Sequence, residues 1–239
     1  WVIDRRAVTE LLGGNPVHII NDFAAVGYGV IDLQASDWHP LGGGAALADR
    51  PIAVLGPGTG LGVCAVVPVG SGYGVASGEG GHVDFAPNDR QEMALLEILS
   101  EEFGHVSVER LLSGAGIVTL YKALAKLAGR QPAEYSPADI TAAAVAGSDD
   151  LAVAALTTFC RILGAVAGNL ALTLGAKGGV YIAGGILPRF IDFAATSGLR
   201  ERFEAKGRFQ SYLASIPLRV IVKEDLGLHG AIKKLQTTE

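Results

Sequence analysis

Apolar side chains recur along this chain with two different periods, and glycine-rich breaks separate the segments that carry them. In residues 90–103 the apolar positions lie three and four apart with glutamates between them, which predicts an amphipathic helix. Residues 150–174 are apolar on most faces, which is typical of a helix buried between layers. Periodicity or a capping residue predicts further helices over 4–12, 23–33, 108–127, 136–146, 188–203 and 227–235.

Short apolar runs that end at glycine, proline or asparagine predict the strands. These runs are 17–20, 52–55, 61–67, 178–182 and 217–222. The second and third runs are predicted to form a hairpin around a glycine-rich turn at 56–60. Residues 38–50 and 70–81 follow neither period, so we expect loops there. Because strands and helices alternate, the chain is predicted to be an α/β protein.

Composition narrows the class of protein. Apolar residues make up 49% and charged residues 18% of the 239 residues, which suffices for a sizeable core and argues against disorder. The formal net charge of −5 gives no reason to expect a nucleic acid or an anionic membrane as partner. Cys64 and Cys160 lack metal-binding spacing and are predicted to be buried thiols in a reduced compartment. Since no apolar run of a secretory signal follows the first residues, we expect a cytoplasmic protein.

Two glycine-rich segments have the composition of ligand-binding loops. Gly58, Thr59 and Gly60 lie in the hairpin turn, where backbone N–H groups and a hydroxyl could bind phosphate. An ordinary hairpin turn is the alternative, and a Walker loop is excluded because no Gly-Lys-Ser/Thr follows. Gly184 and Gly185 end a predicted strand, where they could admit a nucleotide or could only form a tight turn.

Asn21 and Asp22 follow the run 17–20, and open α/β sheets bind ligands at the carboxyl ends of their strands. The Asp22 carboxylate could accept a hydroxyl proton during phosphoryl transfer, or it could cap the next helix.

Three further polar side chains suit a polyhydroxylated ligand. Glu79 and His82 lie on a glycine-rich loop, and Glu109 lies at a helix start, where the helix dipole alone could favour it. A metal site of His82 with Asp84 is disfavoured, because two ligands do not make a site. The combination of a carboxylate at a strand end, two glycine loops and these hydroxyl-binding groups predicts ATP-dependent phosphorylation of a sugar or polyol.

The segments that carry these residues resemble bacterial glucokinases, in the same order along the chain. They are Ile-Ile-Asn-Asp-Phe at 19–23, Gly-Thr-Gly-Leu-Gly at 58–62, Gly-Glu-Gly-Gly-His-Val-Asp-Phe-Ala-Pro at 78–87, Glu-Arg-Leu-Leu-Ser-Gly at 109–114 and Ile-Ala-Gly-Gly-Ile at 182–186. The resemblance implies an actin-like ATPase fold of the ribonuclease H-like type, with two α/β domains around a cleft. It also implies that ATP, with Mg²⁺, phosphorylates glucose to glucose 6-phosphate at the entry to glycolysis.

The resemblance further implies roles for the matching residues. Asp22 would be the general base that accepts the proton of the sugar's 6-hydroxyl. The other positions would bind sugar hydroxyls (Asn21, Glu79, His82, Glu109), form a second phosphate loop (Gly58, Thr59, Gly60) or lie against adenosine (Gly184, Gly185).

The family begins with an Asp-x-Gly-Gly-Thr-Asn type loop that contacts the phosphates and helps to place Mg²⁺, and this sequence has no such segment. We therefore expect residues 1–32 and 223–239 to be the remnant of a small domain truncated at its N-terminus, and residues 33–222 to be the large domain. Such a chain is expected to be impaired as a kinase, and a non-catalytic glucose-binding fragment is the alternative. Homodimers are common among such kinases, and residues 150–174 are the candidate surface for one.

Overall fold

The computed structural model describes residues 3–236 and is built around one six-stranded sheet, in the order β1-β6-β5-β2-β3-β4. The strands are β1 Trp38–Pro40, β2 Ile52–Pro57, β3 Leu61–Val69, β4 Gly72–Gly78, β5 Gly179–Ile182 and β6 Leu218–Ile221. Strands β2, β5 and β6 are parallel, whereas β1, β3 and β4 pair antiparallel with their neighbours. The predicted β2–β3 hairpin is confirmed, with Ile52 opposite Val66 and Pro57 opposite Leu61.

Two strands lie where the sequence predicted loops. Strand β4 pairs with β3 from Val63 opposite Gly78 to Val69 opposite Gly72. Its side chains are partly or fully exposed, so no apolar alternation marks it in the sequence. The short strand β1 pairs with β6 at the sheet edge. Both strands arise from backbone pairing to a neighbour, which a local pattern does not report.

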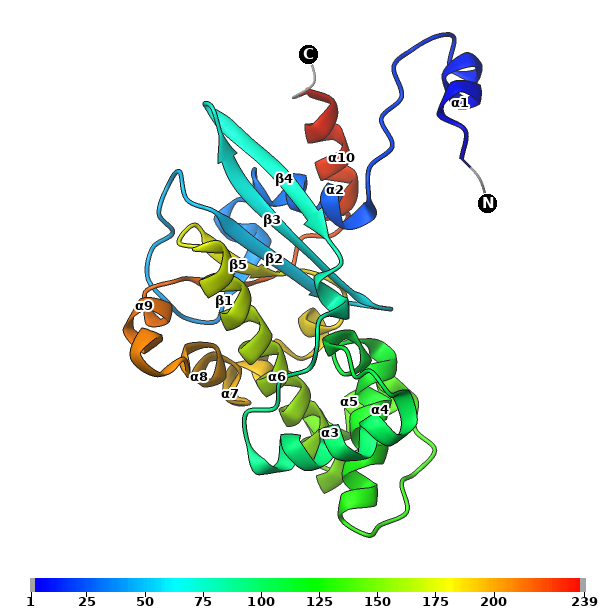
Figure 1. Ribbon diagram of the computed structural model, residues 1–239, viewed down its shortest axis with the longest axis vertical. Helices are drawn as coiled ribbons and strands as arrows, with labels where there is room; N and C mark the ends of the chain where they lie inside the picture. The colour runs from blue at the N-terminus through cyan, green and yellow to red at the C-terminus, as the bar shows by residue number, and fades with distance from the viewer. Residues whose placement is uncertain (1–2, 237–239) are drawn as a thin grey trace.

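The strand predicted at 17–20 is wrong for the described chain. These residues form no strand, and Ile19 is 54% exposed. An apolar run becomes a strand only where a partner strand satisfies its N–H and C=O groups, and none pairs with this run among residues 3–236. Figure 1 shows the run as an extended segment that carries α1 (Arg5–Leu11) away from the sheet.

The helices mostly follow the predictions, and α3 (Arg90–Phe103) and α6 (Asp150–Leu174) have the predicted bounds. The others are α2 Asp22–Val30, α4 Gly114–Leu127, α5 Pro137–Ala146, α7 Ile191–Thr196, α8 Leu199–Glu204, α9 Gln210–Ala214 and α10 Leu226–Gln236. Within residues 3–236, five short 3-10 turns join them: η1 Ala35–Asp37, η2 Gly80–His82, η3 Val108–Arg110, η4 Leu187–Phe190 and η5 Gly207–Phe209. The helix predicted over 188–203 is divided into η4, α7 and α8, because Gly198 has a left-handed backbone (φ +83°) between α7 and α8.

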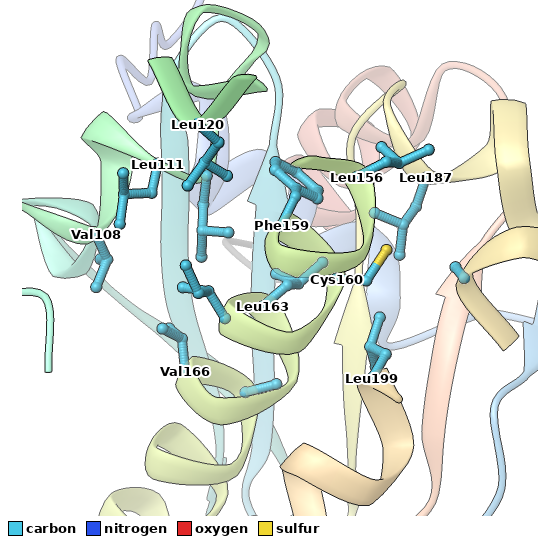
Figure 2. Close-up of a cluster of buried hydrophobic side chains, with 14 of the residues drawn as sticks. Val108, Leu111, Leu120, Leu156, Phe159, Cys160, Leu163, Val166, Leu187 and Leu199 are labelled. Atoms are coloured by element: carbon cyan, nitrogen blue, oxygen red, sulfur yellow. The ribbon is translucent and has the colours of Figure 1, made fainter. Parts of the chain in front are cut away.

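Different helices cover the two faces of the sheet. Leu55, Val63 and Ile182 point to the face covered by α6, where the larger apolar core lies (Figure 2). Their neighbours Val54 and Cys64 point to the opposite face, which α2 and α10 cover. This alternation within each strand follows from the period of two in extended backbone, and it makes the sheet the middle layer of three.

Helix α6 is long and apolar enough to cross a membrane by composition, but 78% of its most apolar window is buried inside the protein. Its side chains Leu156, Phe159, Cys160 and Leu163 lie in the core shown in Figure 2. The helix is thus a buried core element, as expected from its sequence. Leu170, Leu172 and Leu174 near its end stay partly exposed, and both a homodimer and α6 as its surface stay predictions.

Helix α5 has the predicted cap. The hydroxyl oxygen of Ser136 accepts the N–H of Asp139, and the Asp139 carboxylate accepts the backbone N–H and the hydroxyl of Ser136. These bonds from Ser136 lower the pKa of Asp139. We expect Ser136→Ala to cost about 1 kcal/mol, and to lower Tm by roughly 2–4 °C, in a thermal unfolding experiment. Ser71→Ala, in the exposed β3–β4 turn, is the matched control. Equal Tm values for the two variants would contradict a role for the cap.

Candidate active site

The glycine-rich turn 58–60 is closed on itself and attached to the start of α4. The N–H of Gly58 donates to the carbonyl of Gly60 at 2.8 Å, and the N–H of Gly114 donates to the carbonyl of Gly58 at 2.8 Å. Ser113 caps α4 by accepting the N–H of Gly116. The turn therefore lies beside a helix N-terminus, where the N–H groups and the helix dipole favour an anion. The side chain of Thr59 is exposed at this position.

Glu109, in η3, reaches the base of the same turn. Its Oε2 atom accepts the N–H of Leu61 at 2.8 Å. A Cβ atom at Gly60 would lie 2.5 Å from this oxygen, so only glycine allows the carboxylate to come so close. The Glu109 side chain keeps 31% of its surface exposed. It is thus held by the turn while remaining open to a ligand.

The imidazole of His82 lies between two carboxylates. Its Nδ1 atom is 4.0 Å from Oε1 of Glu109, and its Nε2 atom is 4.0 Å from Oε2 of Glu79. The three side chains come from segments that are tied by hydrogen bonds, since the N–H of Val108 donates to the carbonyl of Val83 at 3.0 Å. The structure thus brings Glu79, His82 and Glu109 together, although nearly thirty positions separate Glu79 from Glu109 in the sequence.

Asp84 does not join His82 in a metal site. Its Oδ1 atom lies 2.9 Å from Nε2 of His105, with which it forms an ion pair when that ring is protonated. Among residues 3–236, no group of three His, Cys, Asp or Glu side chains is arranged to hold a metal ion.

Asn21 and Asp22 lie at the start of α2, and Asn21 rather than Asp22 caps this helix. Asn21 is the cap, because its Oδ1 accepts the N–H groups of Phe23 at 2.9 Å and Ala24 at 3.0 Å. Asp22 is the first residue of the helix, is exposed, and accepts the N–H of Phe23 through Oδ1. The ring of Phe23 lies against Gly62, where an added Cβ would collide with it. This contact places the start of α2 beside the β2–β3 hairpin, close to the turn 58–60.

A cavity of about 950 Å³ opens from the turn. Gly58 and Thr59 line it on one side and Gly185 on another, so two of the predicted nucleotide-binding segments face one space. Gly184 lies instead in an adjoining cavity of about 610 Å³, which Gly185 also lines.

The walls of the larger cavity include residues that sequence reasoning did not single out. They come from the start of α4, from the length of α5 and from residues at η4, and among them are Ala115, Ala138, Thr141, Ile186 and Arg189. The caps Ser113 and Ser136 mark both helix starts in the sequence. Nothing local indicates that the two starts face the same cavity.

Neither thiol takes part in this site. Burial raises the pKa of Cys64 to about 12 and that of Cys160 to about 12. Both cysteines are buried and form no disulfide, so they are small apolar residues of the core, as predicted.

Two solved structures share this arrangement of sheet and helices. A glucokinase from an Antarctic psychrotroph has a TM-score of 0.91 and 36% identity, and the match covers 97% of this chain and 72% of that chain. A glucokinase from Balamuthia mandrillaris in complex with glucose has a TM-score of 0.77 and 27% identity, with 91% and 65% covered. The chain is therefore a sugar kinase of the actin-like ATPase fold, which confirms the expected fold class.

The sequence comparisons identify the family. A family model for glucokinase matches residues 1–238. The glucokinase of Cronobacter sakazakii is 49% identical over 238 residues, covering 100% of this chain and 74% of that protein. The chain belongs to the glucokinase family, and the resemblance drawn from its motifs is confirmed.

Proposed function

We propose that this glucokinase transfers the γ-phosphoryl group of ATP to the 6-hydroxyl of glucose at the site formed by Asp22, Glu109 and the turn 58–60. One observation carries the proposal. A single carboxylate, that of Glu109, binds the N–H of Leu61 at the base of the turn and also faces the imidazole of His82. The candidate phosphate loop and the candidate hydroxyl-binding cluster thus share one side chain, which would hold a nucleotide and a sugar close together.

Asp22 would act as the general base. As the 6-oxygen of glucose forms a bond to the γ-phosphorus, the bond from phosphorus to the β,γ-bridging oxygen breaks and ADP leaves. The hydroxyl proton passes to a carboxylate oxygen of Asp22, which is exposed at the start of α2. Because Asn21 caps the helix with its Oδ1 atom, its amide N–H₂ group would remain to donate to the sugar.

Glu79, His82 and Glu109 would bind the other sugar hydroxyls. A carboxylate accepts hydroxyl protons, and an imidazole can donate from one nitrogen and accept at the other. An epimer that displaces one hydroxyl would leave one of these groups unpaired, which supports selectivity for glucose.

The nucleotide would bind along the cavity of about 950 Å³. Gly58, Thr59 and Gly60 would contact phosphate beside the N-terminus of α4, and Gly184 and Gly185 would lie against adenosine. Mg²⁺ is usually held by substrate phosphates with one or two carboxylates. Mg²⁺ would enter the site bound to the ATP phosphates.

We retain three expectations with this proposal. The protein would be cytoplasmic. Residues 1–32 and 223–239 would belong to a small domain, of which Trp1, Val2 and 237–239 lie outside the described residues, and residues 33–222 would form the large one. The protein would form a homodimer, for which the partly exposed residues of α6 are the candidate surface.

Calorimetric titration with glucose, alone and then with a magnesium–ATP analogue, tests the assignment. Glu109→Gln is expected to weaken glucose binding about 10- to 100-fold, because hydrogen bonds to a charged group contribute roughly 1.5–3 kcal/mol. Glu101→Gln is the matched control, since Glu101 is an exposed carboxylate on α3 that contacts Lys126 instead. If the unmodified protein is folded but binds neither ligand, the proposed function is wrong.

A further inference from the structure

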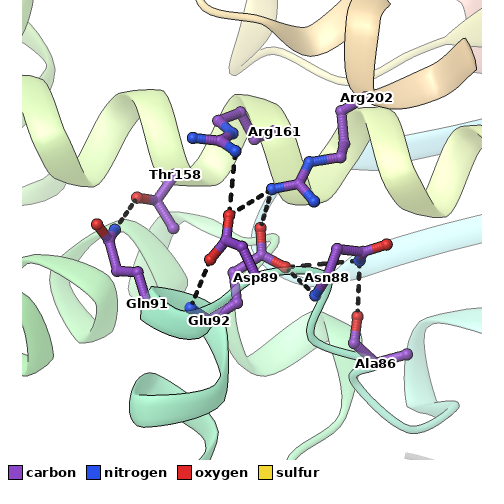
Figure 3. A network of polar contacts seen from close by, with 8 residues as sticks. All are labelled: Ala86, Asn88, Asp89, Gln91, Glu92, Thr158, Arg161 and Arg202. Carbon is purple, nitrogen blue, oxygen red and sulfur yellow. Dashed lines mark hydrogen bonds and ion pairs between the residues drawn. The ribbon is translucent and has the colours of Figure 1, made fainter. Parts of the chain in front are cut away.

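A charged cluster around the buried Glu92 adjoins the segment that follows His82, and the proposed mechanism does not use it (Figure 3). Glu92 is only 2% exposed, and its Oε1 atom accepts from Nη2 of Arg202 at 2.8 Å. The same Nη2 atom lies 2.6 Å from Oδ2 of Asp89. Arg161 donates to this Asp89 oxygen at 3.0 Å, and its side chain is 44% exposed. Helices α3, α6 and α8 thus meet at this cluster.

The cluster holds the C-terminal end of residues 83–88, the segment that follows His82. The second oxygen of Glu92, Oε2, accepts the backbone N–H of Asn88 at 2.7 Å. The Asn88 side chain in turn donates to the carbonyl of Ala86 at 2.9 Å. One carboxylate therefore joins Arg202 on α8 to the backbone at Asn88, as Figure 3 shows.

The other end of this segment carries the candidate sugar ligands. The N–H of Phe85 donates to the carbonyl of Val106 at 2.9 Å, and the N–H of Val108 donates to the carbonyl of Val83 at 3.0 Å. These bonds pair residues 83–85 with residues 106–108. His82 lies directly before the first segment, and Glu109 lies directly after the second. Residues 83–88 thus connect His82 at one end to Glu92 at the other.

We propose that Arg202 is a positioning residue for sugar binding, which acts through Glu92 and Asn88 to hold residues 83–88 and so to place His82 opposite Glu109. The inference rests on the proposed function of these two side chains. It goes beyond that function because Arg202 itself touches neither the sugar-binding cluster nor the cavity.

The chemistry of the cluster supports a role in placing the loop. A buried ion pair often contributes no more to stability than apolar packing of equal volume. Apolar packing is already present on the same helices, since Leu95 on α3 and Leu199 on α8 are fully buried. The ion pair in addition orients the Glu92 carboxylate, because one oxygen must face Arg202 while the other faces the Asn88 N–H.

The test compares three variants. Arg202→Met alone would leave Glu92 buried without a partner, so it is combined with Glu92→Gln, which removes both charges while keeping an oxygen for the Asn88 N–H. Arg202→Lys keeps one cation for the same carboxylates. Arg161→Met is the matched control, because it removes a cation from Asp89 but not from Glu92. Glucose affinity by calorimetry, backbone amide hydrogen exchange and Tm are measured on each full-length protein.

We expect the Arg202→Met/Glu92→Gln protein to bind glucose roughly tenfold more weakly, since a small misplacement of a binding group has effects of this size or larger. Amides of residues 83–88 should exchange faster, Arg202→Lys should restore much of both properties, and Arg161→Met should change neither. A purely structural cluster would lower Tm with an unchanged glucose affinity in the folded protein, and that result would overturn the proposal. If the unmodified protein does not bind glucose, the proposed function fails, while the exchange rates still decide whether Arg202 fixes this segment.

Discussion

Asp22→Asn is expected to lower kcat for glucose phosphorylation by a factor of about 10³, within the range that general base catalysis contributes. Asparagine has the same shape and keeps an oxygen for the N–H of Phe23, which Asp22 Oδ1 accepts at 2.7 Å. It has no lone pair of comparable basicity for the hydroxyl proton. Glucose binding should therefore change little, and the loss should fall on the chemical step.

The measurement is ADP formation at saturating glucose and ATP, together with calorimetric glucose affinity. Asp192→Asn is the control, because Asp192 is likewise an exposed carboxylate in the first turn of a helix. A variant at Asp22 that keeps more than about a tenth of kcat would be incompatible with a general base.

Gly230→Ala should destabilise the folded protein by about 3 kcal/mol or more, as overpacking against a rigid backbone does. Gly230 lies where α10 crosses α2, and an added Cβ would collide with the carbonyl oxygen of Ala25 and come within 2.6 Å of the N–H nitrogen of Gly29. Both neighbours are helical backbone, so neither can move aside without separating the two helices.

Urea unfolding of Gly230→Ala and Gly227→Ala provides the comparison. Gly227 is also in α10, but an added Cβ there meets no atom within 4 Å. Alanine at that position should be neutral or stabilising by up to about 1 kcal/mol, because glycine is the poorer helix former. The close packing of α10 on α2 would be refuted if the two variants had the same free energy of unfolding.

The fold was predictable wherever a local signal and tertiary packing agree. Helix α3 begins after Asp89 and α6 after Asp149, and in both cases the aspartate caps the helix through its side chain. Strand β4 was not predictable, because it is held by pairing with β3 rather than by an apolar face. The run 17–20 shows the reverse case, in which an apolar pattern exists but no described strand pairs with it.

Part of the candidate site was likewise predictable from the sequence, and part was not. The residue types of Glu79, His82 and Glu109 indicated hydroxyl binding, and the structure adds that they converge. The contact of Glu109 with Leu61 was not predictable, because it depends on the lack of a side chain at Gly60. Neither was the cluster around Arg202, whose partners lie more than a hundred positions away in the sequence.

The two oxygens of Glu109 have different neighbours, one at the base of the turn and the other at the imidazole. A sugar that moves this carboxylate would alter its hydrogen bond with the Leu61 N–H. A phosphate that changes the shape of the turn would in the same way alter the position of the carboxylate that binds the sugar. If the proposed site is right, the occupancies of the two substrates are linked through one shared group. Thermodynamic reciprocity requires that each substrate alter the dissociation constant of the other by the same factor, whichever binds first.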